Sequence, residues 1–168
     1  IQIPNSVTTI GDYAFSGCSG LTSINIPNGV TLIGDYAFKS CSGLTSINIP
    51  NGITSIGNDA FYGKDIDTIN IPDTITSIGI SAFWDSHLSS ITIPSNVTSI
   101  GSQAFANSTY LTSIICLATT APSILGSTFQ NVKTNGTLTV PSGSTGYNVW
   151  MGTGDYYLGK YGWTKVEQ

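Results

Sequence analysis

The chain has 168 residues, which is enough for one domain with a sizeable hydrophobic core. Only 8% of the residues are Asp, Glu, Lys or Arg, against about 25% in an average soluble domain, so Ser, Thr, Asn and Gly must supply most of the polar surface. With no Arg, one His and a net charge of −4, the chain lacks the clustered basic residues of a nucleic-acid-binding protein.

The first 116 residues contain a unit that recurs five times. A glycine returns at spacings of 23, 23, 22 and 22 residues, and an Ala-Phe pair and a proline return with it. A period of this length lies in the range of leucine-rich repeats. The three columns are Gly11, Gly34, Gly57, Gly79 and Gly101; Ala14-Phe15, Ala37-Phe38, Ala60-Phe61, Ala82-Phe83 and Ala104-Phe105; and Pro4, Pro27, Pro50, Pro72 and Pro94.

Each copy ends in the pattern Leu-x-x-Ile-x-Ile, first at residues 21–26 and next at residues 44–49. Alternation at its last three positions predicts a short strand with one buried face. The segment IGDYAFSGCSGL spaces its apolar residues as a helix does, so we expect a short helical turn that directs Ala14 and Phe15 inward. Stacked copies would pair their strands about 4.8 Å apart and bury the Ile, Phe and Leu columns in one core.

Residues 117–168 break the period and are predicted to cap the last repeat. The final turn of a solenoid exposes an apolar end and an unpaired strand edge, which a cap would cover. We favour this role over a ligand site for the aromatic residues of the segment, which are Tyr147, Trp150, Tyr156, Tyr157, Tyr161 and Trp163.

The opening letters IQIP match the end of the repeat, INIP, and carry no initial Met. We interpret the sequence as a fragment in which the first repeat is truncated, with any signal or anchor outside it. An uncovered first turn would also favour self-association. No apolar run approaches the roughly 18 residues that cross a bilayer, so we expect no direct membrane insertion.

The repeat reads IPxxVTxIGxxAFxxCxxLTSIxIP, which resembles the BspA-type leucine-rich repeats of bacterial surface proteins and of some parasitic protists. The later segments CLATTAPSI, LTVPSGSTGY and GWTKV resemble the C-terminal ending of bacterial members. The resemblance implies a right-handed leucine-rich-repeat solenoid, mostly β, in a secreted or cell-surface protein. It also implies adhesion to host or neighbouring-cell components, such as the matrix proteins fibronectin and fibrinogen.

No arrangement of residues predicts catalysis. His87 is the only histidine, and a solvated turn is the favoured interpretation of its position. The carboxylates of Asp65, Asp67, Asp73 and Asp85 are spread over neighbouring copies, and a flat repeat surface offers no cleft for a glycosidase pair. The chain has no Cys-x-x-Cys, no His pair and no calcium-loop pattern. We therefore predict a non-enzyme without catalytic, metal-binding or cofactor-binding residues.

The chain has three cysteines. Cys18 and Cys41 share a column in adjacent copies, where rung spacing puts their Cα atoms about 5 Å apart and allows a disulfide. Cysteine also packs well as a small apolar residue, and Cys116 replaces the last Ile of its strand. An odd count argues against a disulfide framework, so we expect three buried thiols and leave the oxidation of Cys18 and Cys41 open.

Two surfaces are candidates for partner binding. The first is the polar outer face of the strands, which we expect to be concave and to bind a protein or a glycan. Its residues are Ser23, Asn25, Ser46, Asn48, Thr68, Asn70, Ser90 and Thr92. The second is an aromatic patch of Tyr62 and Trp84, because exposed Trp and Tyr often anchor interfaces; packing against the turns is the alternative role.

The leading hypothesis is an extracellular or cell-surface recognition module that adheres to a protein or glycan. The alternative is a structural spacer within a larger surface protein, with no ligand of its own. An ice- or crystal-binding solenoid is a third, less favoured, reading. It rests on one repeated column: Thr8, Thr31, Thr54, Thr76 and Thr98.

Overall fold

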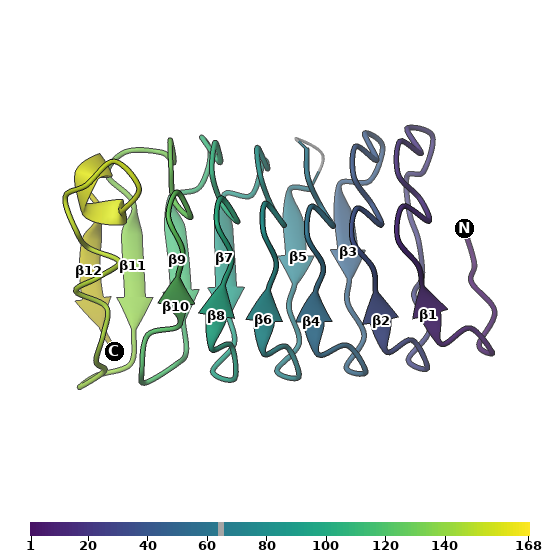
Figure 1. Ribbon diagram of the computed structural model, residues 1–168, viewed down its shortest axis with the longest axis horizontal. Helices are drawn as coiled ribbons and strands as arrows, with labels where there is room; N and C mark the ends of the chain where they lie inside the picture. Colours follow the sequence, from purple (N-terminus) through teal and green to yellow (C-terminus); the bar gives the residue numbers. More distant parts are fainter. Residues whose placement is uncertain (64–65) are drawn as a thin grey trace.

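The computed structural model describes residues 1–63 and 66–168, which wind into a solenoid whose turns stack along one axis (Figure 1). Short strands on two sides of each turn pair with the same positions of the next turn, and all of these pairs are parallel. The predicted repeat solenoid is confirmed, with nearly all of its regular structure in β-strands.

One side of the solenoid is a continuous six-stranded sheet that the sequence analysis did not predict. Each strand has two residues, and in β4 and β6 the second residue is a buried Ile while the first faces outward. The unpredicted strands come from the Val-Thr-x-Ile-Gly part of the repeat. They are β1 (Thr9–Ile10), β2 (Leu32–Ile33), β4 (Ser55–Ile56), β6 (Ser77–Ile78), β8 (Ser99–Ile100) and β10 (Ser123–Ile124).

The other side carries two separate sheets, which contain strands predicted from the Leu-x-x-Ile-x-Ile pattern (β3, β5, β7 and β9) and two that were not predicted (β11 and β12). The strand predicted in the first copy is reduced to one bridge, between Gln2 and Asn25. β3 pairs with β5, while β7, β9, β11 and β12 form the second sheet. No ladder joins β5 to β7 in the part of the chain that the structure describes. We call this side the split face. Its strands are β3 (Ser46–Asn48), β5 (Thr68–Asn70), β7 (Ser90–Ile93), β9 (Ser113–Cys116), β11 (Thr137–Val140) and β12 (Thr164–Glu167).

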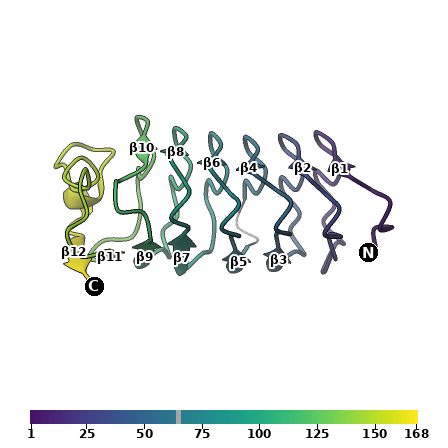
Figure 2. The same ribbon diagram turned by 90° about the horizontal axis from the view of Figure 1, so that it is seen from below.

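The split face is straight along the solenoid. In Figure 2 its strands lie in one row, with the six-stranded sheet in a second row opposite. The predicted concave surface is therefore flat. A solenoid curves when one side needs more room per turn than the other, whereas here both sides are strands, which repeat at about 4.8 Å.

Stacked phenylalanine rings run through the centre of the solenoid. Successive ring centroids lie 5.2 to 5.9 Å apart with nearly parallel planes. All but the first ring are buried. The column therefore continues the same core contact from turn to turn. Its members are Phe15, Phe38, Phe61, Phe83, Phe105 and Phe129.

The glycine column lets successive turns approach closely. A Cβ at Gly79 would lie 2.7 Å from the carbonyl carbon of Gly57, and a Cβ at Gly101 would lie 2.6 Å from that of Gly79. Gly11, in the first turn, has no atom within 4 Å of the corresponding position. Glycine is therefore a steric requirement at Gly79 and Gly101, whereas the β10 turn carries Leu125 at the corresponding position.

The segments around the Ala-Phe pairs are turns, so the predicted short helical turns are wrong. The only helix among the described residues is the 3-10 segment η1 (Leu158–Tyr161). The N–H groups of Tyr13 and Phe15 donate to the carbonyls of Asp35 and Ala37 in the next turn, at 3.0 and 2.8 Å. A φ of 58° at Tyr13 directs the backbone toward that turn, whereas an α-helix bonds four residues back within itself.

A helix that could cross a membrane would have to be long and apolar, and the described residues contain none.

The stack continues past residue 116, where the sequence analysis placed the end of the repeats. β10 pairs with β8, and the ring of Phe129 lies 5.9 Å from that of Phe105. The buried Trp150 packs against Phe129 at 5.2 Å, and the buried Tyr147 lies 5.3 Å from Trp150. The predicted division between residues 1–116 and 117–168 therefore does not coincide with a break in the solenoid.

The cysteines differ in burial. Cys41 and Cys116 are buried as predicted, but Cys18 is exposed, so that part of the prediction is wrong. The Cys41 thiol donates to the carbonyl of Phe15 in the preceding turn, at 3.0 Å. Cys18 belongs to the first turn, and the described chain places no earlier turn over it.

Candidate functional site

The eight residues predicted to form the partner-binding face all lie exposed on the same side of the solenoid. Within the strands, Ser46 is in register with Thr68, and Asn48 with Asn70. Ser23 and Asn25 extend the two columns toward the N-terminus, and Ser90 and Thr92 continue them on β7. The predicted alignment of these side chains is therefore present, whereas binding by them stays a prediction.

Asn48 and Asn70 interact with each other across β3 and β5. The Nδ2 atom of Asn70 donates to Oδ1 of Asn48 at 3.4 Å. Each side-chain amide has two donor hydrogens and an acceptor oxygen, so the pair keeps donors and acceptors for a partner. A partner that approaches this face meets neutral groups with fixed spacing.

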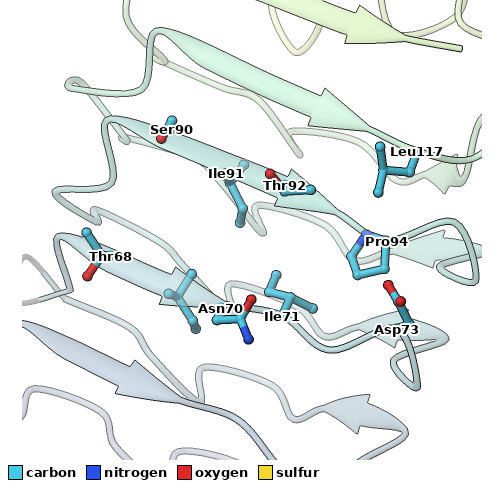
Figure 3. A pocket seen from close by; sticks show the side chains of 10 residues that line it. Thr68, Asn70, Ile71, Asp73, Ser90, Ile91, Thr92, Pro94 and Leu117 are labelled. Carbon is cyan, nitrogen blue, oxygen red and sulfur yellow. The ribbon is translucent and has the colours of Figure 1, made fainter. Parts of the chain in front are cut away.

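A groove of about 300 Å³ lies where the face is split between β5 and β7. Figure 3 shows Thr68 and Asn70 along one side of it and Ser90 and Thr92 along the other. Four of the eight predicted face residues therefore line one cavity. Ile69 and Ile91 also line it, between these polar residues.

Four further lining residues gather at one end of the groove, beyond the last residues of the strands. Ile71 and Asp73 follow β5, Pro94 follows β7, and Leu117 follows β9. Leu117 is 45% exposed although it is a large apolar residue. This end therefore combines an apolar wall with one carboxylate, and Figure 3 shows Pro94 between Leu117 and Asp73.

The aromatic patch of Tyr62 and Trp84 is a stacked pair. The two rings lie 4.4 Å apart and are within 9° of parallel, and both side chains are half-buried. The Nζ atom of Lys39 lies 4.2 Å from the ring centroid of Tyr62 and 3.4 Å from Oδ1 of Asp59. These contacts pack the pair along the turns, and its role as an interface anchor stays a prediction.

A second aromatic pair precedes this patch. The rings of Tyr13 and Tyr36 stack at 4.5 Å, and Lys39 also lies 5.0 Å from the Tyr36 centroid. The negative charge of Asp59 is the largest cause that raises the pKa of Tyr36, and Tyr13 adds to it. The patch is thus part of a longer row of contacts between turns.

The sequence also matches a known family of repeats, in agreement with the stacked, strand-paired turns of the structure. The family described as "BspA type Leucine rich repeat region (6 copies)" matches residues 1–112 and 32–149. The chain belongs to this family.

Solved structures of bacterial leucine-rich repeat proteins resemble this BspA-type chain. A leucine-rich repeat protein from Bacteroides ovatus is 34% identical, with a TM-score of 0.72 over 83% of this chain and 39% of its own. A leucine-rich cell surface protein from Faecalibacterium prausnitzii has 22% identity and a TM-score of 0.56 over 83% and 54%. A leucine-rich repeat protein from Eubacterium ventriosum has 24% identity and a TM-score of 0.51 over 85% of this chain and 49% of its own.

This BspA-type chain thus spans less than two thirds of each of these structures. The two structures below 25% identity share the fold alone. No curated protein matches the chain.

The histidine of this BspA-type chain lies beside one of the predicted surface carboxylates, that of Asp67. Nδ1 of His87 is 3.7 Å from Oδ1 of Asp67, and its ring meets the edge of Tyr110 at 4.9 Å. Asp73 lies at the groove, and Asp65 is outside the described residues. Across residues 1–63 and 66–168, no three His, Cys, Asp or Glu side chains gather as metal ligands.

The threonine column lies beside the six-stranded sheet, and its hydroxyls face the chain itself. Oγ1 of Thr76 donates to the carbonyl of Thr54, and Oγ1 of Thr98 donates to that of Thr76, at 3.1 and 3.2 Å. Thr31 donates to Thr8 in the same way. These hydroxyls bond between turns, which gives the column a structural role.

Sequence reasoning missed the charged and apolar end of the groove, although the repeats contain a signal for it. The residue after the repeated proline is Asn28 and Asn51 after the second and third prolines, but it is Asp73 after the fourth. The proline column itself ends in Leu117, one residue after Cys116. The two residues that differ from their repeat columns, Asp73 and Leu117, therefore both line the groove.

Proposed function

We propose that this chain is a non-enzymatic recognition module of a cell-surface or secreted protein, and that it binds an extracellular protein or glycan through the split face. The observation that carries the proposal is the groove between β5 and β7, which four predicted face residues line. The structurally similar protein from Faecalibacterium prausnitzii is a cell surface protein, which supports the proposed cell-surface location.

A rigid face suits recognition by many weak contacts. The strands of the split face are held by the Ile and Phe columns below them, so their hydroxyl and amide groups keep one spacing. Binding to such a face orders few side chains, and a small ordering cost favours affinity. The neutral columns supply hydrogen bonds, while the groove adds apolar contact.

The test is surface plasmon resonance over immobilised matrix proteins, together with a glycan array. The double variant Asn48→Lys, Asn70→Lys places two positive charges directly opposite each other on the split face. We expect it to weaken saturable binding tenfold or more, which is about 1.4 kcal/mol. A matched pair of charges on neighbouring strands of the six-stranded sheet, in the variant Ser55→Lys, Ser77→Lys, should leave binding unchanged.

The alternative function, a spacer without a ligand, gives a different result. The folded wild type would then bind none of the immobilised proteins or glycans. Equal loss of binding in both double variants would point to net charge rather than to the split face, and would also contradict the proposal.

A further inference from the structure

The groove between β5 and β7 has two chemically different parts. Along the strands its lining is hydroxyl and amide groups, whereas beyond the strand ends Pro94 and Leu117 stand beside Asp73. Because neighbouring parallel strands end at the same edge, three consecutive turns contribute to this one corner. The Asp73 carboxylate therefore shares this corner with the apolar residues Pro94 and Leu117.

Of the described residues that line the groove, Asp73 alone is charged. It is exposed, and its carboxylate forms no ion pair or side-chain hydrogen bond with the described residues. Its backbone carbonyl accepts a bond from Nδ2 of Asn96 at 2.7 Å, which anchors the residue in its turn. The corner thus offers a positioned negative charge that no group among the described residues neutralises.

We propose that this corner receives a lysine or arginine side chain of the partner protein. Such a side chain buries an apolar stem while it keeps a charged tip in polar surroundings. The stem would lie against Pro94 and Leu117, and the tip would meet the Asp73 carboxylate in a charge-assisted hydrogen bond. The inference rests on the proposed function and narrows its partner from a protein or a glycan to a protein segment with a basic residue.

The size and charge of the groove favour this occupant. Its volume of about 300 Å³ is at the lower limit of ligand pockets, which range from about 300 to 1,000 Å³, and so suits one side chain and its flanking backbone. The outward groups of Thr68, Asn70, Ser90 and Thr92 are placed to bond that backbone. A neutral sugar would donate hydroxyl hydrogen bonds to the carboxylate but leave its charge uncompensated, and an anionic sugar would be repelled by it.

The experiment is an NMR titration of the ¹⁵N-labelled chain with two capped pentapeptides. One peptide is Gly-Ser-Lys-Ser-Gly, and the other has norleucine, which keeps the stem and lacks the charge, in place of lysine. We expect saturable shifts of the amides of Thr68–Asp73 and of residues 90–94, with the lysine peptide binding about two- to fivefold more tightly.

The matched variants are Asp73→Asn and Asp67→Asn. Each removes one negative charge near β5, the first beyond the end of the strand and the second just before its start. Asp73→Asn should make the two peptides bind equally, whereas Asp67→Asn should preserve the preference for lysine. A Leu117→Ser variant should weaken both peptides to a similar extent, because it removes part of the wall beside the stem.

Three results would overturn the inference: no saturable shift at the groove, equal binding of the two peptides to the wild type, or an equal effect of the two Asp variants. The proposed function is tested separately. The Asn48→Lys, Asn70→Lys variant could lose a glycan or protein that the wild type binds while lysine peptides cause no shifts at the groove. The proposed recognition by the split face would then stand, and the inference of a basic side chain in the groove would be wrong.

Discussion

The two sides of the solenoid are built from the same repeats but differ in continuity. The six-stranded sheet pairs every turn with the next from β1 to β10. The split face pairs β3 with β5 and then begins a new ladder at β7. Both sides rest on the same Phe column, so the core does not require both sheets to be continuous.

The comparison indicates a division of labour within one repeat. Hydroxyls beside the six-stranded sheet are used between turns, as in the bond from Thr76 to Thr54. On the split face, Thr92 has no such bond among the described residues, and its side chain is exposed and lines the groove. Both sides hold turns together, but the hydroxyl of Thr92 on the split face is left available to a partner.

The largest expected effect comes from the core that both sides share. Phe83 is fully buried between Phe61 and Phe105, with ring centroids at 5.6 and 5.5 Å. Phe83→Ala should lower the free energy of unfolding by about 3–5 kcal/mol, measured by urea denaturation. Phe15→Ala, at the half-buried first ring, should cost clearly less. Equal losses would show that burial along the column is uniform, contrary to this account.

The next effect tests the close approach of turns. Gly79→Ala places a Cβ 2.7 Å from the carbonyl carbon of Gly57, so we expect a loss of about 1–3 kcal/mol in the same measurement. Gly11→Ala meets no atom within 4 Å and should change stability by less than about 0.5 kcal/mol. A tolerated Gly79→Ala would mean that the turns separate more readily than the structure indicates.

The smallest effect compares the two sides directly. Thr76→Val removes the bond from Oγ1 to the carbonyl of Thr54, at 3.1 Å, and should cost about 0.5–1 kcal/mol. Thr92→Val has the same change of shape on the split face, where no such bond exists among the described residues, and should be close to neutral. Thermal unfolding of the two variants measures the difference. A larger loss at Thr92 would place an unrecognised contact on the split face.

Most of the fold was predictable from the sequence because each contact between turns recurs in every copy of the repeat. The Leu-x-x-Ile-x-Ile strands, the stacked Phe column and the outward alignment of Asn48 and Asn70 all follow from period and alternation. The helical spacing around Ala14 and Phe15 was misleading. With a positive φ at Tyr13, the N–H groups of Tyr13 and Phe15 donate to the next turn, and alternate N–H groups, such as that of Ala14, donate within their own turn. The spacing of apolar residues alone does not distinguish these two patterns of backbone hydrogen bonds.

The site was only half predictable for a related reason. Columns identify residues that share a face, so Thr68 and Ser90 were found. They do not identify where a ladder stops, because β5 and β7 obey the same pattern and follow loops of the same length. Asp73 and Leu117 stand out only as departures from their columns, which become informative once the groove is seen between them.

The most direct test of the account is backbone amide hydrogen exchange, followed by NMR for each strand residue. The account predicts protection that is continuous across β4, β6 and β8 but reduced on β5 and β7, because those two strands lack a shared ladder. Equal protection of β5, β7 and their counterparts on the six-stranded sheet would contradict it, since the split face would then be closed and would have no groove to offer a partner.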